Sequence, residues 1–123
     1  MQEHELDYAR AKIATASRAA RLESPLDTVF IHLGVLEGLR SSSERARNFG
    51  FQGKLCIHPE QIEPVNQVFS PSSEEIEQAQ KYVDAFTTAE ASGSASIQVE
   101  GYFIDYPIVE KARRTLDLSL IHI

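Results

Sequence analysis

The stretch Phe51–Pro71, FQGKLCIHPEQIEPVNQVFSP, predicts a short strand that passes directly into a helix. Its apolar run Leu55–Ile57 is typical of a buried strand, and Pro59–Phe69 has helical periodicity with proline at a favourable first position. The abrupt boundary at His58 has two interpretations. It is typical of a strand that delivers a polar side chain to a binding rim, and also of an ordinary strand-to-helix turn.

The residues before this stretch continue the alternation of helices and strands. Residues 4–21 have helical periodicity, and Leu26–Leu33 (LDTVFIHL) is a β-branched and aromatic run of strand length. Residues 36–49 return to helical spacing, with Glu37 in the first turn and Gly50 as the stop. This order predicts parallel βαβ units and an α/β fold. The apolar stripe of the first helix consists of Tyr8, Ala9, Ile13, Ala16, Ala19 and Ala20.

The character of the chain changes after Ser70-Pro71. Ser72 and Glu75 have the spacing of a capping box, which opens a new helix. We therefore expect two parts, an α/β part over residues 1–70 and an α-β-β-α part over residues 71–117.

Within the second part, Ile97–Val99 and Tyr102–Ile104 predict a tight hairpin. Gly101 lies at the turn, where it supplies a positive φ. Pro107 then begins a final helix, which should end near Leu116 or Asp117. The remaining residues 118–123 (LSLIHI) are what one reading frame of a common transposon-end sequencing adapter encodes. We expect an adapter-derived tail, with a natural apolar tail as the alternative.

The composition describes a globular protein of one small domain. The chain has 123 residues, of which 42% are hydrophobic and 24% are charged. A formal charge of -6 without a Lys/Arg cluster argues against nucleic acid, and no apolar stretch has the length of a membrane span. The single cysteine, Cys56, excludes an internal disulfide framework. We expect a cytoplasmic protein, or a mitochondrial-matrix one in a eukaryote, with no nucleic-acid or membrane partner.

Two residues are candidates for chemistry. His58 follows a predicted parallel strand, where α/β folds bind ligands, although the local sequence favours a simple helix cap. Asp105 lies between the hairpin and the final helix. The helix dipole alone explains a carboxylate there, and the alternative is a positioned general base.

Three other residues have ordinary interpretations. The glycines around Lys54 precede a strand, which excludes a P-loop, and Lys54 is expected to be solvated at the opposite rim. His32 could face a ligand or lie at the edge of the core. Cys56 is expected to be a small buried group within a strand. The spacing of carboxylates and histidines predicts no metal site.

Four stretches extend these observations: YARAKIATASRAA, LDTVFIHLGVLEGLRSSSERARNFGFQGK, CIHPEQIEPVNQVFSPSSEEIEQAQ and VEGYFIDYPIVEKAR. Together they resemble the citrate lyase β-subunit-like (HpcH/HpaI aldolase/citrate lyase) family, which includes malyl-CoA and citramalyl-CoA lyases. The combination of GK-x-x-IHP-x-QI-x-x-VN-x-x-F-x-P with a later G-x-x-ID-x-P is specific. Within the family, the chain looks most like the citramalyl-CoA lyase branch.

The resemblance implies a (β/α)8 TIM barrel with a C-terminal lid. Such barrels need about 250 residues, so we expect a C-terminal fragment with the last two barrel strands, Leu26–Leu33 and Leu55–Ile57. Residues 1–70 would be the partial barrel, and residues 71–117 the lid. The family reaction is reversible carbon–carbon cleavage of a hydroxyacyl-CoA to acetyl-CoA and a 2-oxo acid. Its Mg2+ ligands lie on earlier strands, so we expect no metal ligand in this chain.

The resemblance also assigns roles to site residues. Asp105 matches the lid carboxylate that exchanges a proton with the acetyl methyl group, acting on a neighbouring subunit of a homotrimer. His58 and Pro59 match the rim that faces coenzyme A, which is part of the substrate. The family often has aspartates where His32 stands and near Val35, so substrate positioning differs there. We expect the fragment to be inactive alone. The alternatives are a CoA-thioester hydrolase and a non-catalytic CoA-binding or oligomerisation module.

Overall fold

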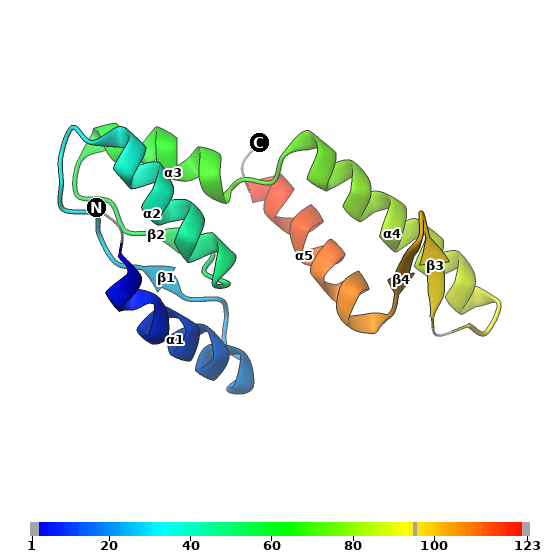
Figure 1. The fold of residues 1–123 in the computed structure, drawn as a ribbon. Coiled ribbons are helices and arrows are strands. Elements are labelled where there is room, and N and C mark those ends of the chain that lie inside the picture. The colour runs from blue at the N-terminus through cyan, green and yellow to red at the C-terminus, as the bar shows by residue number, and fades with distance from the viewer. Residues whose placement is uncertain (1–2, 95, 122–123) are drawn as a thin grey trace. The chain divides into compact units, whose positions relative to one another are not determined.

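The computed structural model describes residues 3–94 and 96–121. The chain divides into two compact units, residues 1–69 and residues 70–123 (Figure 1). No helix within the described residues is long and apolar enough to cross a membrane.

The first unit alternates helices with two short parallel strands. Its elements are η1 (His4–Leu6), α1 (Asp7–Ala19), β1 (Leu26–Asp27), α2 (Leu36–Asn48), β2 (Gly53–Lys54), η2 (Pro59–Gln61) and α3 (Ile62–Phe69). In the parallel pair, Leu26 lies opposite Gly53 and Asp27 opposite Lys54. The predicted helix–strand–helix–strand–helix order is confirmed, with Glu37 in the first turn of α2.

The strand bounds predicted from the sequence are wrong. β1 is only the start of the predicted run Leu26–Leu33, and β2 lies before the predicted run Leu55–Ile57. The pairing of β1 with β2 reaches only to the bond from Leu55 N to Asp27 O (3.0 Å). Within the described residues each strand has one neighbour. β-branched composition reports fit to a pleated surface, so it does not by itself fix how many residues pair with the neighbouring strand.

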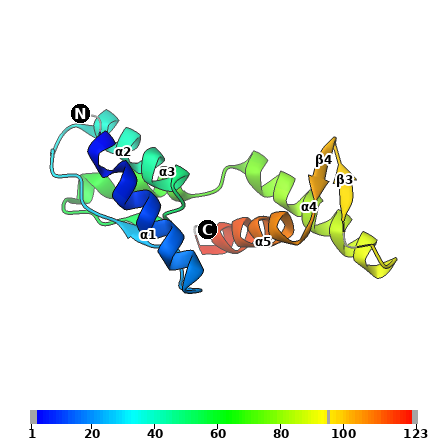
Figure 2. The same cartoon turned by 60° about the horizontal axis from the view of Figure 1, so that its bottom comes forward.

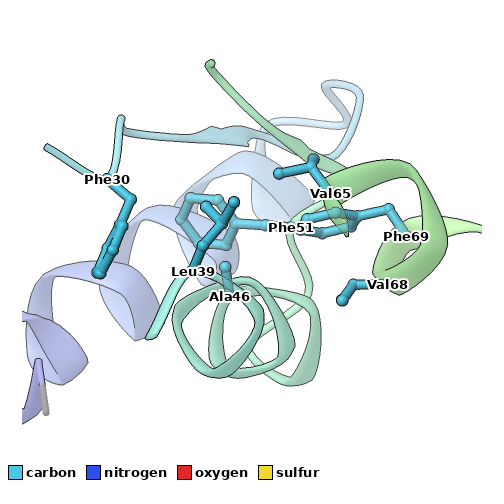
Figure 3. Close-up of a cluster of buried hydrophobic side chains, with 7 residues drawn as sticks. All are labelled: Phe30, Leu39, Ala46, Phe51, Val65, Val68 and Phe69. Atoms are coloured by element: carbon cyan, nitrogen blue, oxygen red, sulfur yellow. The ribbon is translucent and has the colours of Figure 1, made fainter. Parts of the chain in front are cut away.

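The core of the first unit lies between α2, α3 and the segments that adjoin the strands (Figure 3). Its buried side chains are Phe30, Leu39, Ala46, Phe51, Val65, Val68 and Phe69. Gly38 makes this packing possible, because a Cβ atom there would lie 2.9 Å from Cζ of Phe30. The absence of a side chain at this position therefore lets the Phe30 ring lie against α2.

The apolar stripe of α1 does not face this core. Tyr8 and Ile13 are exposed, whereas Arg10 is buried. The amphipathic rule assumes that the apolar face of a helix meets a core. Here Asp7 pairs with Arg45 on α2, and Arg10 pairs with Asp27 on β1, so ion pairs hold this helix instead.

The second unit consists of two long helices and a hairpin: α4 (Ser73–Ala91), β3 (Ile97–Val99), β4 (Tyr102–Ile104) and α5 (Tyr106–Ile121). Figures 1 and 2 both show α4 and α5 side by side, with the hairpin at one end of the pair. The predicted cap at Ser72 is confirmed, since Ser72 Oγ accepts a hydrogen bond from Glu75 N at 3.1 Å. Phe86, Ile104 and Val109 form the core of this unit.

The predicted hairpin is confirmed with its register. β3 and β4 are antiparallel, with Val99 opposite Tyr102 across a two-residue turn. Glu100 has φ 51° and Gly101 has φ 85°, which is the pair of positive values that a type I′ turn requires.

The predicted end of the last helix near Leu116 or Asp117 is wrong, because α5 continues to Ile121. Residues 118–120 contain no glycine or proline, and leucine is a strong helix former, so no local signal stops the helix. His122 and Ile123 lie outside the described residues. The adapter origin of residues 118–123 stays a prediction.

Candidate functional site

The segments that follow β1 and β2 are joined into one rim, which we call the strand-end rim (residues 28–35 and 55–61). The side chain of Gln61 is buried and holds the two segments together. Its Nε2 donates to Phe30 O at 2.9 Å, and its Oε1 accepts from Ile57 N at 2.8 Å. Sequence reasoning did not single out Gln61, although it is the glutamine of the IHP-x-QI motif. The only local indication of a role for Gln61 was that a polar residue stands in the first turn after a predicted strand.

Glu60 makes the second link across the rim. Its Oε1 accepts from Gly34 N at 2.7 Å. Gly34 has φ 78°, a value that glycine adopts without steric cost. The loop after β1 is therefore held at two points by consecutive residues of η2.

His58 caps the helical segment that follows β2. It has extended backbone angles, and its Nδ1 accepts from Glu60 N at 3.2 Å, with Pro59 at the first helical position. This is the cap that the local sequence favoured. A neutral imidazole that accepts at Nδ1 carries its proton on Nε2. The ring is about half exposed, so it retains a donor for a further partner.

Asp105 occupies the junction between β4 and α5. Its carbonyl oxygen accepts from Val109 N at 3.0 Å, which places Asp105 at the start of α5. Ile104 and Val109, on either side, are buried in the core of the second unit. The backbone that carries the partly buried Asp105 is therefore anchored from both directions.

Exposed aromatic residues lie on both sides of Asp105 in the sequence. Tyr102 and Phe103 precede it on β4, and Tyr106 follows it. The Tyr106 ring packs edge-on against Phe86, with centroids 5.0 Å apart. His58 and Pro59 belong to the first unit, where the structure brings them together with Glu60.

Lys54 is not solvated as predicted. Its side chain is fully buried, and Nζ lies 2.6 Å from Asp27 Oδ2 and 3.0 Å from Ser42 Oγ. Arg10 approaches the same carboxylate with Nε at 3.2 Å and Nη2 at 3.0 Å. Arg10 Nη2 also lies 2.7 Å from Glu3 Oε2, which accepts from Ser42 Oγ at 2.8 Å. The alternation of the sequence could not reveal this ion network, because its members lie on four separate elements and at Glu3, just before η1.

The network shifts the protonation of its carboxylates. Burial alone would raise the pKa of Asp27, but the hydrogen bonds from Arg10 and Lys54 outweigh it and lower that pKa below its usual value. In the same way, burial opposes the bonds from Arg10 and Ser42 to Glu3, and the pKa of Glu3 is lowered. Both side chains are therefore carboxylates at neutral pH, as paired buried charges require.

The structure also shows where the two other candidates, His32 and Cys56, lie. His32 is half-buried, and its ring packs edge-on against Phe30 with centroids 5.3 Å apart. Cys56 is exposed, so its predicted burial within a strand is wrong. The reason is that β2 ends at Lys54, before Cys56. Over residues 3–94 and 96–121, no group of three or more His, Cys, Asp or Glu side chains could hold a metal ion.

Comparison with known proteins shows which family this chain resembles. The family model of HpcH/HpaI aldolase/citrate lyase matches residues 1–59. The citrate lyase subunit beta of Leuconostoc mesenteroides is 40% identical over 115 residues, which are 94% of this chain and 38% of that protein. The chain belongs to the HpcH/HpaI aldolase/citrate lyase family.

Other members of the family match at similar levels. The human mitochondrial citramalyl-CoA lyase is 36% identical over 91% of this chain and 33% of its own length. A (3S)-malyl-CoA thioesterase of Cereibacter sphaeroides is 45% identical over 65% of this chain and 28% of its own length. The chain thus spans between a quarter and two fifths of the family members it matches.

A solved structure confirms the fold class. CitE of Mycobacterium tuberculosis, in complex with magnesium, acetoacetate and coenzyme A, superposes with a TM-score of 0.75 at 28% identity. The likeness covers 91% of this chain and 40% of CitE. The predicted α/β fold, a part of a TIM barrel followed by an α-β-β-α unit, is therefore confirmed.

Proposed function

We propose that the full-length protein containing this chain is a carbon–carbon lyase that cleaves a hydroxyacyl-CoA into acetyl-CoA and a 2-oxo acid. The observation that carries the proposal is the match to citrate lyase subunit beta over 115 of 123 residues. A match of that length takes in both units, and with them the strand-end rim and Asp105. The substrate would be of the citramalyl, malyl or citryl type. The fragment alone would be inactive.

Asp105 would transfer the proton at the acetyl carbon. In cleavage, the carbon–carbon bond next to the hydroxyl-bearing carbon breaks, and its electron pair forms the enolate of acetyl-CoA. The hydroxyl group gives its proton to a base, which would lie in the part of the protein outside this chain, as the carbonyl of the oxo acid forms. Protonated Asp105 then donates its proton to the enolate carbon, and in the reverse direction the carboxylate removes it. Such a transfer needs accurate placement and the exclusion of water. The anchored backbone of Asp105 supports the placement, and closure of the lid would exclude the water.

His58 and Pro59 would face the coenzyme A part of the substrate. The Nε2 donor of His58 is suited to a polar group of the thioester or its pantetheine arm. The magnesium ligands of the family would lie in the part of the protein outside this chain, since no group of three or more His, Cys, Asp or Glu side chains in residues 3–94 and 96–121 could hold a metal ion.

The lid carrying Asp105 would close over a neighbouring subunit of a homotrimer. The exposed aromatic residues around Asp105 support this, because aromatic side chains are favoured at protein interfaces. Sedimentation of the full-length protein tests it: we expect a trimer, and a fully active monomer would contradict it. A cytoplasmic or matrix location remains part of the proposal.

The assigned role of Asp105 is tested in the full-length protein with Asp105→Asn. We expect turnover of the acyl-CoA to fall by about 10² to 10⁴, while binding of the CoA thioester is largely kept. Asp117→Asn changes an exposed carboxylate of the same helix and should leave turnover unchanged. Near-normal turnover of Asp105→Asn would refute the role.

A hydrolase is the second candidate, because the malyl-CoA thioesterase relative is 45% identical over its matched region. The products distinguish the two reactions. A lyase releases acetyl-CoA and an oxo acid, whereas a hydrolase adds water and releases free CoA thiol and the hydroxy acid. Thioester binding without either product would instead indicate a non-catalytic module.

A further inference from the structure

Gln61 is buried beneath the strand-end rim, whereas the two residues proposed to face coenzyme A are exposed. Gln61 is 2% exposed. The His58 ring is about half exposed, and Pro59 beside it is exposed as well. The proposed reaction gives Gln61 no contact with the substrate, so any part that this side chain plays must act through other residues.

Gln61 makes three hydrogen bonds, two of which hold the main chain around His58. The side-chain Oε1 accepts from Ile57 N at 2.8 Å, just before His58. The main-chain N of Gln61 donates to His58 O at 3.0 Å. The third bond, from Nε2 to Phe30 O at 2.9 Å, crosses to the segment after β1.

This third bond ties the turn at His58 to the core of the first unit. Phe30 is 3% exposed and belongs to that core. Its ring lies against Gly38 on α2, where a Cβ atom would come within 2.9 Å of Cζ. Since side chains in a close-packed core cannot shift freely, the carbonyl oxygen of Phe30 gives Gln61 a fixed point of attachment.

The amide group of Gln61 matches both of its main-chain partners. An amide carries a carbonyl oxygen that accepts and an NH2 group that donates. Ile57 N takes the acceptor and Phe30 O takes the donor, so one side chain satisfies both. Buried polar contacts that are satisfied in this way make their surroundings rigid. The main chain that carries the His58 ring is therefore held in place before any ligand binds.

We propose that Gln61 is a positioning residue, which holds the main chain of His58 so that the imidazole Nε2 donor meets the coenzyme A part of the substrate. This inference rests on the proposed function, in which His58 faces coenzyme A. A binding residue that is already ordered loses less conformational freedom when the ligand arrives. Gln61 thereby strengthens the binding of coenzyme A without touching it.

Binding of coenzyme A to the full-length protein tests this role. Gln61→Met keeps the length of the side chain but removes the N–H donor and leaves only a weak acceptor. We expect the Kd for coenzyme A, measured by calorimetry at a temperature where the variant is folded, to rise about tenfold or more. Gln67→Met is the matched control, because it changes an exposed glutamine on the adjoining α3, and it should leave the Kd unchanged. An unchanged Kd in Gln61→Met would overturn the proposal.

A double-mutant cycle with His58 separates positioning from a general loss of stability. If Gln61 acts through the His58 ring, Gln61→Met should raise the Kd for coenzyme A much less in protein that already carries His58→Ala. Equal fold-changes with and without the His58 ring would show that Gln61 acts by another route, which would also overturn the proposal.

A crystal structure of the unmodified full-length protein with coenzyme A serves as a second test, should Gln61→Met fail to fold. We expect His58 Nε2 within about 3.2 Å of a polar atom of coenzyme A, with the bonds from Gln61 to Ile57 N and Phe30 O kept. A complex in which His58 makes no such contact, or in which these bonds are broken, would overturn the inference. Binding and diffraction need no turnover, so release of acetyl-CoA and an oxo acid tests the lyase proposal separately.

Discussion

Lys54 Nζ lies 2.6 Å from Asp27 Oδ2, and the two residues are also register partners in the parallel strand pair. This residue pair therefore joins β1 to β2 twice, by main-chain pairing and by a buried ion pair. Since Arg10 binds Asp27 from α1, this carboxylate links a helix to both strands.

Removal of one partner should destabilise the protein strongly. We expect Lys54→Met in the full-length protein to lower the free energy of unfolding by about 3–5 kcal/mol, because breaking a buried pair leaves an uncompensated charge. The matched control is Lys81→Met, which removes an exposed pair with Glu100 and should change stability little. Urea unfolding measures both, and similar losses would contradict the structural role of Lys54.

Acid should weaken the first unit through its paired carboxylates. The hydrogen bonds from Arg45 lower the pKa of Asp7 from 3.8 to about 2, and the pKa of Asp27 is also lowered. A lowered pKa means that the unfolded state binds more protons as pH falls, so acid favours unfolding. This contribution is present above the unfolded pKa and is lost as pH falls from about 4 toward 2.

Unfolding free energy measured against pH tests this linkage. Asp7→Asn should flatten the curve between about pH 4 and pH 2, because it removes one group with a shifted pKa. Asp117→Asn serves as an exposed control for the loss of one carboxylate. An unchanged slope in Asp7→Asn would contradict the assignment.

The hairpin turn should affect catalysis because it positions Asp105. Gly101 and Gly93 both have φ 85°, and a Cβ atom added at either would meet nothing within 4 Å. Alanine should therefore cost similar stability at both positions, about 1 kcal/mol or more. Only Gly101→Ala lies in the hairpin that leads to Asp105, so we expect only this variant to lower turnover. Equal turnover in the two variants would argue against a positioning role for the hairpin.

His58 can be tested as a cap and as a binding residue separately. His58→Ala should lose about 1 kcal/mol of stability, because Glu60 N loses its acceptor. His58→Asn keeps a side-chain oxygen for the cap and should restore the stability. If His58 also contacts coenzyme A, the KM for the CoA thioester stays raised in His58→Asn. Recovery of both quantities would leave His58 as a cap alone.

Local signals predicted several parts of the fold correctly. The helix cap at Ser72, the tight hairpin turn at Gly101 and the stop at Gly50 depend on residues within a few positions of each other. Their physics is contained in the chain segment itself, so the sequence was sufficient. The motif around His58 likewise identified the strand-end rim, and its family resemblance identified the barrel.

The sequence by itself thus determined the order of the elements, the turns and caps, and the family of the chain. The tertiary structure decided the extent of β1 and β2, because strand length depends on paired edges rather than on composition. It also decided that Lys54 and Arg10 are buried, and that Gln61 joins the two loops of the rim. These outcomes depend on contacts between residues far apart in the chain, and only folding brings such residues within the few ångströms over which ion pairs and hydrogen bonds act.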